Sequence, residues 1–533
     1  MGLLTRRAVD RAMSHDLGGL PVSRVMRAGR VTVRPSDSVE RVQQLMLAEG
    51  WGQIPVVADS DDGQAGDRPI GVVTRTDVLN YLFQALPETA VPEMRRLLVH
   101  SLPPALWQMV VVVGETADSL GMPLYFVGGI VRDLLLGHSP TDLDMVVEGD
   151  AIALVQKLQA RFGGQIHTHS RFGTAKWFVT PAIWQRIAPT ASLENVPATI
   201  DFVTARTEFY REPSALPEVS RGSIKLDLHR RDFTINTLAI RLDGVHLGEF
   251  LDFYGGRRDL EQGVIRVLHS LSFVDDPTRI LRAVRLEQRL GFRIEPRTME
   301  LLVSSLPMLD RVTGDRIRHE IELALRESNP VPVMERLWEL GVMRQIHPAL
   351  AWSQETAVAF ARVPKLLTDP EWKAALRGES PAFVYFALWI LPLTAEEQTA
   401  VMDRLRVRKA TREDMAAIRR VYAGLCALPP TARRSEVAAL LRPYPARVLL
   451  AVRAAFGEDK PSDWIEAYYR EWQWVKTAVT GDDLRAMGLK PGPLYGRLLN
   501  HLLAARLDGE VQTEAEEKEL LNKLLAEIDQ TNK

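Results

Sequence analysis

The chain has 533 residues and a mass of 59.8 kDa, which exceeds one ordinary domain and predicts three or four. Apolar residues make up 46% and charged residues 25%, which excludes a disordered chain, and a net charge of −2 restricts any nucleic-acid contact to local basic patches. The single cysteine, Cys426, cannot form an internal disulfide, and the apolar run Ala382–Leu391 is too short to cross a bilayer and predicts a core helix. Because no signal-peptide pattern is present either, we expect a cytoplasmic protein without membrane contact.

Two segments near the start match each other. Gly2–Ala12 (GLLTRRAVDRA) aligns with Gly71–Tyr81 (GVVTRTDVLNY), and each is an apolar strand followed by Thr-Arg and a helix. An amphipathic helix and the strand Ile54–Ala58 lie between them. Residues 1–86 therefore resemble a CBS repeat region whose first copy is truncated.

CBS modules work as pairs, yet the first copy here begins at its own final strand. We therefore expect the chain to be a fragment of a longer protein, and Gly2–Ala12 to be poorly ordered or covered in an oligomer such as a homodimer. The resemblance also implies that Thr74 and Asp77 bind the ribose of an adenosine nucleotide. A helix cap at Asp77 explains the same residues equally well.

The next segment is polar and contains two prolines. Pro87–Met94 (PETAVPEM) predicts a linker, which we extend over residues 87–101. Apolar periodicity predicts one helix over Arg95–Leu120, leading into the next domain. Beyond Arg297 the strand patterns fade, and helical periodicity continues to the end of the chain.

A glycine pair follows a short apolar strand in Tyr125–Glu148 (YFVGGIVRDLLLGHSPTDLDMVVE). Gly128 and Gly129 allow the backbone to bend tightly and to approach a ligand. The helix Ile130–Leu136 would point its first amides at that ligand, which suits a triphosphate. A plain strand-to-helix turn is the alternative.

Two aspartates stand at the end of this segment. Asp142 and Asp144 are two residues apart in an alternating strand, so both carboxylates project from one face. Unpaired they would be destabilising, whereas as ligands of Mg²⁺ they would also hold phosphate oxygens. Asp201, in the apolar strand ATIDFVTAR, offers a third carboxylate, or else a capped strand end. Three acids around two magnesium ions are suited to the attack of a hydroxyl on an α-phosphate.

The combination of G-G-x-V-R-D, L-L-G and D-x-D resembles the first motif of class II tRNA nucleotidyltransferases and bacterial poly(A) polymerases, in the DNA polymerase β superfamily. RRDFTIN (Arg230–Asn236) resembles the second motif of that family, and LDFYGGRRDL (Leu251–Leu260) resembles the third. The resemblance implies that Asp142, Asp144 and Asp201 are catalytic, the first two as metal ligands. The nucleotide contacts that it implies here are Gly128, Gly129, Arg132, Arg231, Asp232 and Asn236.

DDPTR (Asp275–Arg279) occupies the position of the family's E-D-x-x-R, with an aspartate in place of the outer glutamate. The resemblance implies that Asp276 and Arg279 act as a protein template for the base. An Asp that accepts beside an Arg that donates complements cytosine and adenine, but not uracil or guanine. A salt bridge at the start of a helix is the alternative. RILRAVR extends the match and adds Arg282 and Arg285 as nucleotide contacts.

The helical remainder has fewer distinctive features. Basic residues gather in Arg404–Asp414 and Arg442–Ala455 and could hold RNA phosphates, although charge-rich helices are more often simply solvated. Gly481–Leu503 predicts a helix, a Gly-Pro turn and a second helix, similar to the tail of CBS-fused family members. We expect Trp472 and Trp474 in the core.

The predicted fold class is α+β. The expected parts are a partial CBS module (α/β) at 1–86, a linker at 87–101, a small mixed-sheet polymerase β-like head at 102–245, a neck with the template motif at 246–330, and an all-α, tRNA-binding body and tail at 331–533. In its fusion with CBS repeats, the chain resembles CC-adding or A-adding enzymes whose full-length forms often carry a DHH phosphoesterase domain upstream. The segment Glu208–Lys225 lies where the family carries the flexible loop that decides activity.

The resemblance implies an enzyme that uses magnesium to add C and/or A from CTP or ATP to the 3′ end of tRNA. CC-adding, A-adding and CCA-adding activities all remain open at this point. The alternatives are a poly(A) polymerase and a non-catalytic, nucleotide-sensing RNA-binding module.

Overall fold

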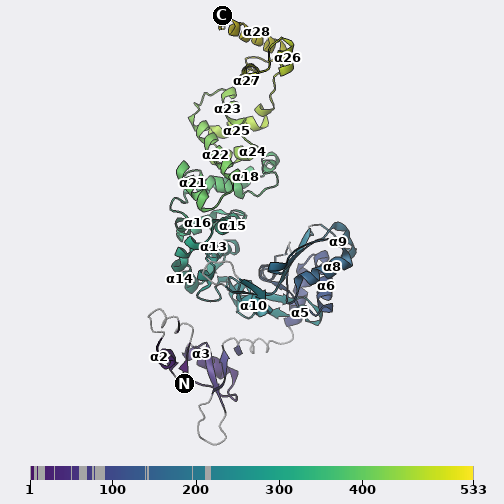
Figure 1. The fold of residues 1–533 in the computed structure, drawn as a ribbon, viewed down its shortest axis with the longest axis vertical. Helices are drawn as coiled ribbons and strands as arrows, with labels where there is room; N and C mark the ends of the chain where they lie inside the picture. The colour runs from purple at the N-terminus through teal and green to yellow at the C-terminus, as the bar shows by residue number, and fades with distance from the viewer. Residues whose placement is uncertain are drawn as a thin grey trace. The chain divides into compact units, whose positions relative to one another are not determined.

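The computed structural model describes most of the chain (Figure 1). Its residues divide into two compact units. One unit contains residues 1–211, 217–262 and 266–268, and the other contains 212–216, 263–265 and 269–533. The described residues are 2–4, 9, 19–28, 31–49, 51–58, 69–74, 77–78, 90–138, 140, 143–194, 196–209 and 218–531.

The N-terminal part of the first unit is a small α/β module. Its elements are β1 (Gly2–Leu3), α2 (Val22–Val25), β2 (Arg27–Ala28), α3 (Val39–Glu49), β3 (Gln53–Val57) and β4 (Pro69–Thr74). β3 and β4 form an antiparallel pair, and Ile54 and Met46 belong to the apolar cluster between α3 and these strands. β1 pairs with β2, so the first residues of the predicted truncated repeat find a partner within the chain. Most of Gly2–Ala12 lies outside the described residues.

The rest of the first unit is built on a mixed sheet, as predicted. Its seven strands lie in the order β13-β12-β5-β6-β9-β8-β7. β6 and β9 run parallel, and every other neighbouring pair in this sheet is antiparallel. The strands are β5 (Leu124–Val127), β6 (Asp144–Val147), β7 (Gln165–His169), β8 (Thr174–Phe178), β9 (Thr199–Thr204), β12 (Ala239–Arg241) and β13 (Phe250–Leu251).

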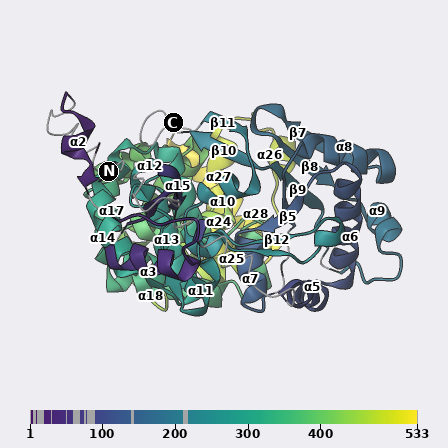
Figure 2. The same cartoon turned by 90° about the horizontal axis from the view of Figure 1, so that it is seen from below.

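Helices cover both faces of this sheet. α6, α8 and α9 pack together, and α8 lies against β7, β8 and β9 (Figure 2). Burial alternates along β9, so Ile200 and Phe202 face α8 while Asp201 lies on the opposite face. On that opposite face α10 packs against Tyr125 and Val127. The helical elements are α6 (Pro104–Ser119), α7 (Gly129–Leu135), α8 (Ala151–Phe162), α9 (Pro181–Ile187), α10 (Ile224–His229), η2 (Thr234–Asn236), η3 (Gly244–His246) and α11 (Gly256–Glu261).

The single helix expected over Arg95–Leu120 is wrong, because the chain forms two helices there. α5 spans Ala90–Ser101, and α6 begins at Pro104 with Pro103 as its N-cap. Two consecutive prolines have no N–H to donate, so they cannot continue a preceding helix but are well placed to start a new one. α5 also occupies most of the segment assigned to the linker.

The second unit is helical, as predicted. β15 (Arg293–Ile294), which pairs with β14 (Val264–Ile265), is the last strand among the described residues. Along the chain the helices are α12 (Ser272–Asp275), α13 (Arg279–Leu290), α14 (Pro296–Ser305), α15 (Gly314–Leu325), α16 (Val331–Glu339), α17 (Val342–Ile346), α18 (Gln354–Leu366), α19 (Pro370–Ala375), α20 (Ala382–Ile390), α21 (Ala395–Arg404), α22 (Lys409–Ala427), α23 (Arg434–Leu441), α24 (Ala446–Phe456), α25 (Lys460–Arg470), α26 (Gly481–Ala486), α27 (Pro493–Asp508) and α28 (Glu514–Thr531). The predicted core helix is confirmed as α20, and the predicted helix, turn and helix near the end are confirmed as α26 and α27.

The close approach of α6 to the chain after β12 gives a stability prediction. A Cβ at Gly114 would overlap the backbone carbonyl of Leu242, which cannot swing aside. We expect Gly114→Ala to destabilise the head by about 1–3 kcal/mol, although alanine is the better helix former. Gly496→Ala in α27 is the control: nothing lies within 4 Å of its Cβ, so it should stabilise by about 0.5–1 kcal/mol. Urea unfolding measures the free energy of unfolding of both variants. An equal gain in stability in both would contradict the close approach of Gly114 to the Leu242 carbonyl.

Candidate active site

The turn from β5 into α7 depends on Gly128. Its φ of 73° and ψ of −123° favour glycine. A Cβ at this position would lie 2.6 Å from Nη1 of Arg231 and 3.2 Å from the carbonyl oxygen of Asn236. The predicted strand, turn and helix are therefore confirmed, and the missing side chain makes room for a guanidinium from the second motif.

Two of the three predicted acids lie side by side at this end of the sheet. Asp144 opens β6, Asp201 lies in β9, and the two are register partners on parallel strands. Register partners project from one face, on strands about 4.8 Å apart. Because β5 runs antiparallel to β6 with Phe126 opposite Met145, Gly128 follows β5 at the edge where β6 begins. Asp142 lies outside the described residues.

The two described acids suit a divalent cation. Asp144 is exposed and Asp201 is half-buried, so their oxygens are accessible to an ion that prefers oxygen ligands. Nζ of Lys176, on β8, lies 2.8 Å from Oδ2 of Asp201, and the two side chains are 42% and 38% exposed. An ion pair this exposed contributes about 0–1 kcal/mol, so a divalent ion can displace the lysine. Within the described residues, no group of three or more His, Cys, Asp or Glu side chains could hold a metal.

A buried hydrogen-bond chain joins the first motif to the second. Nη1 of Arg132 donates to Oδ1 of Asn236 at 2.8 Å, and Nδ2 of Asn236 donates to Oδ1 of Asp232 at 2.9 Å. The same Asp232 oxygen accepts the backbone N–H of Phe233 at 2.9 Å. The structure thus brings together three of the predicted nucleotide contacts, which are all buried.

Asp227 organises the arginines beside this chain, and the sequence analysis did not single it out. Its fully buried carboxylate accepts from Arg230 Nη2 at 2.6 Å and from Arg231 Nη2 at 2.9 Å. Burial alone would raise the pKa of Asp227, but the guanidiniums of Arg231 and Arg230 outweigh it and hold the pKa below its usual value. An acid three and four residues before two arginines in LDLHRR was the available indication.

Arg231 keeps one donor uncommitted. Its Nε is buried and has no hydrogen-bond partner among the described residues. An orphaned buried donor costs about 1–3 kcal/mol. Together with the space left by Gly128, it suits an anionic ligand such as a phosphate.

The predicted template residues lie at the start of α13 in the second unit. Arg279 is buried, and its Nη1 donates to Oγ of Ser272 at 2.6 Å. Oδ1 of Asp276 accepts the N–H and the hydroxyl of Thr278 at 3.1 and 2.7 Å, and it lies 2.7 Å from Nη2 of Arg316. The carboxylate therefore starts α13 and ties it to α15, through an arginine to which the sequence analysis gave no role.

The other two predicted arginines of α13 have acidic partners. Arg282 lies 3.9 Å from Glu320 of α15, and Arg285 lies 3.3 Å from Glu327. Burial raises the pKa of Glu320, and the charges of Arg282 and Arg285 only partly offset this effect. Their contact with a nucleotide remains a prediction.

Comparison with known proteins places this geometry in a family. Residues 124–266 match the family described as "Poly A polymerase head domain", 291–353 match "Probable RNA and SrmB- binding site of polymerase A", and 22–84 match "CBS domain". The A-adding tRNA nucleotidyltransferase of Halalkalibacterium halodurans is 31% identical over 78% of this chain and 92% of its own length. The chain belongs to the tRNA nucleotidyltransferase family.

Another member of the family aligns with almost the whole chain. The A-adding tRNA nucleotidyltransferase of Geobacter sulfurreducens is 35% identical over 98% of this chain, which spans 60% of the length of that relative. Among solved structures, a CCA-adding enzyme in an apo form is 32% identical with a TM-score of 0.67, over 81% of this chain and 98% of its own. The CCA-adding enzyme of Thermotoga maritima complexed with tRNA is 31% identical with a TM-score of 0.62, at the same coverage.

The predicted nucleotide contacts of the CBS module form a helix-start motif. Oδ2 of Asp77 accepts the backbone N–H of Thr74 at 2.8 Å and its hydroxyl at 2.7 Å, and Oγ1 of Thr74 accepts the N–H of Asp77 at 3.2 Å. The hydrogen bonds from the Thr74 hydroxyl and amide lower the pKa of Asp77. This reciprocal pattern favours the helix-cap interpretation.

Most arginines of the two basic runs bind the protein itself. Arg404 donates to the carbonyls of Leu309 and Val312 at 2.9 and 3.1 Å, and Arg447 lies 2.8 Å from Asp414. These contacts fasten helix ends, so much of the basic character has a structural role.

The two tryptophans differ. Trp472 is in the core, as predicted, whereas the core assignment of Trp474 is wrong, because its short 3₁₀ turn leaves that side chain 69% exposed. In the described part of the chain, the helices are too short or too polar to span a bilayer.

The buried carboxylate of Asp227 gives a pH-dependent prediction. Because its pKa is lowered on folding, it stabilises the fold above its ordinary pKa, and this contribution is lost as the pH falls through the lowered value. We expect Asp227→Asn to cost about 3–5 kcal/mol at pH 7, with the difference from wild type shrinking below about pH 4. Urea unfolding across this range measures it. Asp482→Asn, at an exposed site, is the control, and a pH-independent difference would contradict the pairing.

Proposed function

We propose that the chain adds the terminal A to the 3′ end of tRNA, using ATP. The observation that carries the proposal is the register pair of Asp144 and Asp201 at the edge of the sheet where the Gly128 turn lies. The two acids can bind a metal ion there, and the guanidinium of Arg231 beside Gly128 can bind phosphates. A-adding is favoured over CC-adding and CCA-adding because the Geobacter sulfurreducens relative, which aligns with 98% of the chain, is named A-adding.

In the proposed reaction the 3′-hydroxyl of the RNA attacks the α-phosphate of ATP. A phosphodiester bond forms, the bond to the β-phosphate breaks, and pyrophosphate leaves. Asp144 and Asp142 would hold magnesium, with Asp201 beside them, and the ion would neutralise phosphate charge and favour loss of the hydroxyl proton to solvent. Arg231 would bind the triphosphate beside Gly128. Solved CCA-adding enzymes of about 30% identity hold CTP or ATP, which supports nucleotide substrates.

The buried chain of Arg132, Asn236 and Asp232 has a positioning part in this proposal. Because all its members are hydrogen-bonded and buried, it holds the second motif rigidly against α7. Asp276 and Arg279 would select the base: the acid accepts from the amino group of adenine, and the arginine donates to N1. The same pair complements cytosine, so it excludes uracil and guanine without choosing between A and C.

Other expectations belong to the proposal as well. The tRNA complex of the Thermotoga maritima enzyme supports tRNA as the partner. A cytoplasmic location, a homodimer and an adenosine nucleotide at Thr74 and Asp77 are retained as proposals. Poly(A) polymerase and a non-catalytic RNA-binding module are the competing functions, and each predicts a different product pattern in the assay that follows.

The test supplies purified chain with magnesium, single labelled nucleotides, and tRNAs that end before the first C, after CC or after CCA. We expect one A on the CC-ending tRNA with ATP alone, and Asp144→Ala should abolish transfer while leaving tRNA binding within about twofold. Addition of C would identify a CC- or CCA-adding enzyme, and a long A tail a poly(A) polymerase. No incorporation under any condition would leave only the non-catalytic module. Loss of tRNA binding in Asp144→Ala would contradict the metal role.

The template proposal has its own matched pair of variants. We expect Arg279→Ala to lower discrimination against UTP and GTP by about 10- to 1000-fold, with a smaller effect on the rate with ATP. Ser272→Ala removes the hydrogen bond that holds Arg279 but keeps the guanidinium, so selectivity should persist. Nucleotide competition assays measure both. Unchanged selectivity in Arg279→Ala would refute the template role.

A further inference from the structure

A cavity of about 510 Å³ lies within the second unit. Its walls come from α15, from α20 with the turn before it, and from the start of α22. The polar lining includes Arg318, Arg326 and Arg408, and the apolar lining includes Phe383 and Phe386. The volume falls in the range of small-molecule sites.

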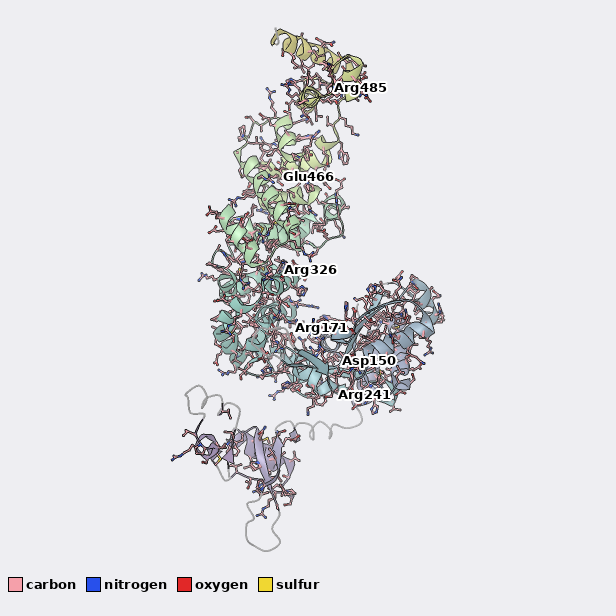
Figure 3. The ribbon with its side chains drawn as sticks, viewed as in Figure 1. Asp150, Arg171, Arg241, Arg326, Glu466 and Arg485 are labelled. Atoms are coloured by element: carbon pink, nitrogen blue, oxygen red, sulfur yellow. The ribbon has the colours of Figure 1, made fainter. Side chains whose placement is uncertain are left out.

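The three arginines of this cavity are not equivalent. Arg318 lies 2.8 Å from Asp315 and 3.4 Å from Glu322, so its charge is neutralised locally. Arg326 and Arg408 are exposed, and their guanidiniums have no hydrogen-bond or ion-pair partner among the described residues. Figure 3 labels Arg326 at the edge of the helical unit. Two uncommitted guanidiniums on one cavity favour an anion.

The aromatic wall adds a second kind of contact. Phe383 and Phe386 are only half-buried, although their neighbours on α20 are mostly in the core. The guanidinium of Arg447 lies 5.8 Å from the centre of the Phe383 ring and holds this wall in place. Phe386 also contacts the ring of Trp389. Partly exposed aromatic side chains beside guanidiniums can bind the base and the phosphate of one nucleotide.

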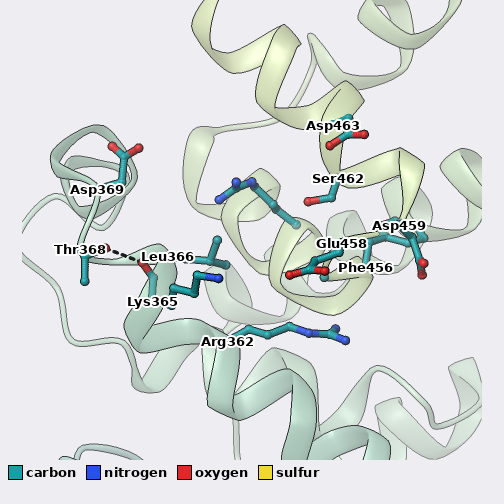
Figure 4. Close-up of a pocket in the computed structure, with 12 residues that line it drawn as sticks. Arg362, Lys365, Leu366, Thr368, Asp369, Phe456, Glu458, Asp459, Ser462 and Asp463 are labelled. Carbon is teal, nitrogen blue, oxygen red and sulfur yellow. Dashed lines mark hydrogen bonds between the residues drawn. The ribbon is translucent and has the colours of Figure 1, made fainter.

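A larger cavity of about 730 Å³ between α18, α24 and α25 lacks these features (Figure 4). Its Arg362 donates to the carbonyl of Ala455 at 3.1 Å, and its Arg453 lies 2.8 Å from Glu466. Glu458 and three aspartates also line it. Because its arginines are engaged and its acids outnumber the remaining cation, Lys365, this cavity suits a nucleotide less well.

We propose that the smaller cavity holds one nucleotide, with its phosphate on Arg326 and Arg408 and its base against Phe383 and Phe386. Glu379, the remaining acid of the lining with no partner among the described residues, can accept from a base amino group or a ribose hydroxyl. This nucleotide has two possible sources, which the test below distinguishes. It is either one residue of the bound tRNA strand or a free nucleoside triphosphate. If it belongs to the tRNA, the inference rests on the proposed function.

The test compares Arg326→Gln/Arg408→Gln with Lys373→Gln/Lys409→Gln in the full chain. The control pair removes the same charge from two exposed lysines that do not line the cavity, one of them next to Arg408. tRNA binding is measured from about 50 to 200 mM salt, together with the number of ATP molecules bound per chain at equilibrium. Thermal unfolding should be unchanged in the arginine variant, because the guanidiniums of Arg326 and Arg408 have no partners to lose. The lysine control loses only the exposed pair of Lys409 with Glu413, which contributes about 0–1 kcal/mol.

For a nucleotide of the tRNA strand, the arginine variant should bind tRNA about tenfold more weakly and reduce the slope of log K against log salt by about one. Phe386→Leu should weaken binding without changing the slope. For a free nucleotide, the arginine variant should bind one ATP fewer per chain, with tRNA binding unchanged. If the arginine variant matches the lysine control in both measurements, the inference is overturned. Neither measurement requires catalysis, so failure of the proposed function would appear separately, as absent incorporation by wild type.

Discussion

The parallel pairing of β6 and β9 is the constraint on which the site depends. It sets Asp144 directly beside Asp201, and two carboxylates on one face repel each other unless a cation lies between or near them. Lys176 forms an exposed ion pair with Asp201 on this face. Two acids that lie side by side and are open to solvent are consistent with a site at which a divalent ion and a triphosphate bind.

In the second motif, by contrast, the acidic side chain is buried and paired with arginines. Asp227 is fully buried and forms ion pairs with both Arg230 and Arg231. The buried carboxylate is therefore compensated by protein side chains, without a ligand. This arrangement holds Arg231 over Gly128 and leaves its Nε as an uncommitted donor. Rigid placement of a donor reduces the cost of ordering it when an anion binds.

Arginines in the helical unit follow the same logic. Most of those in the basic runs fasten helix ends or pair with acids, and their number alone would overstate the surface available to RNA. Arg326 and Arg408 differ in that they line one cavity together, and neither guanidinium has a partner among the described residues. Whether a basic residue can bind a ligand is decided by the partners that folding provides.

The sequence by itself determined the order of the parts, the Gly128 turn, the mixed sheet and the helical remainder, because glycine conformation and apolar periodicity are local properties. It also predicted Asp144 and Asp201 as site residues, but not that they are register partners. Only the tertiary structure decided that pairing, the burial of Asp227 and the exposure of Trp474. Each of these depends on contacts between segments that are distant in sequence, or on how a turn packs. The residue pattern of one segment does not specify which other segment packs against it.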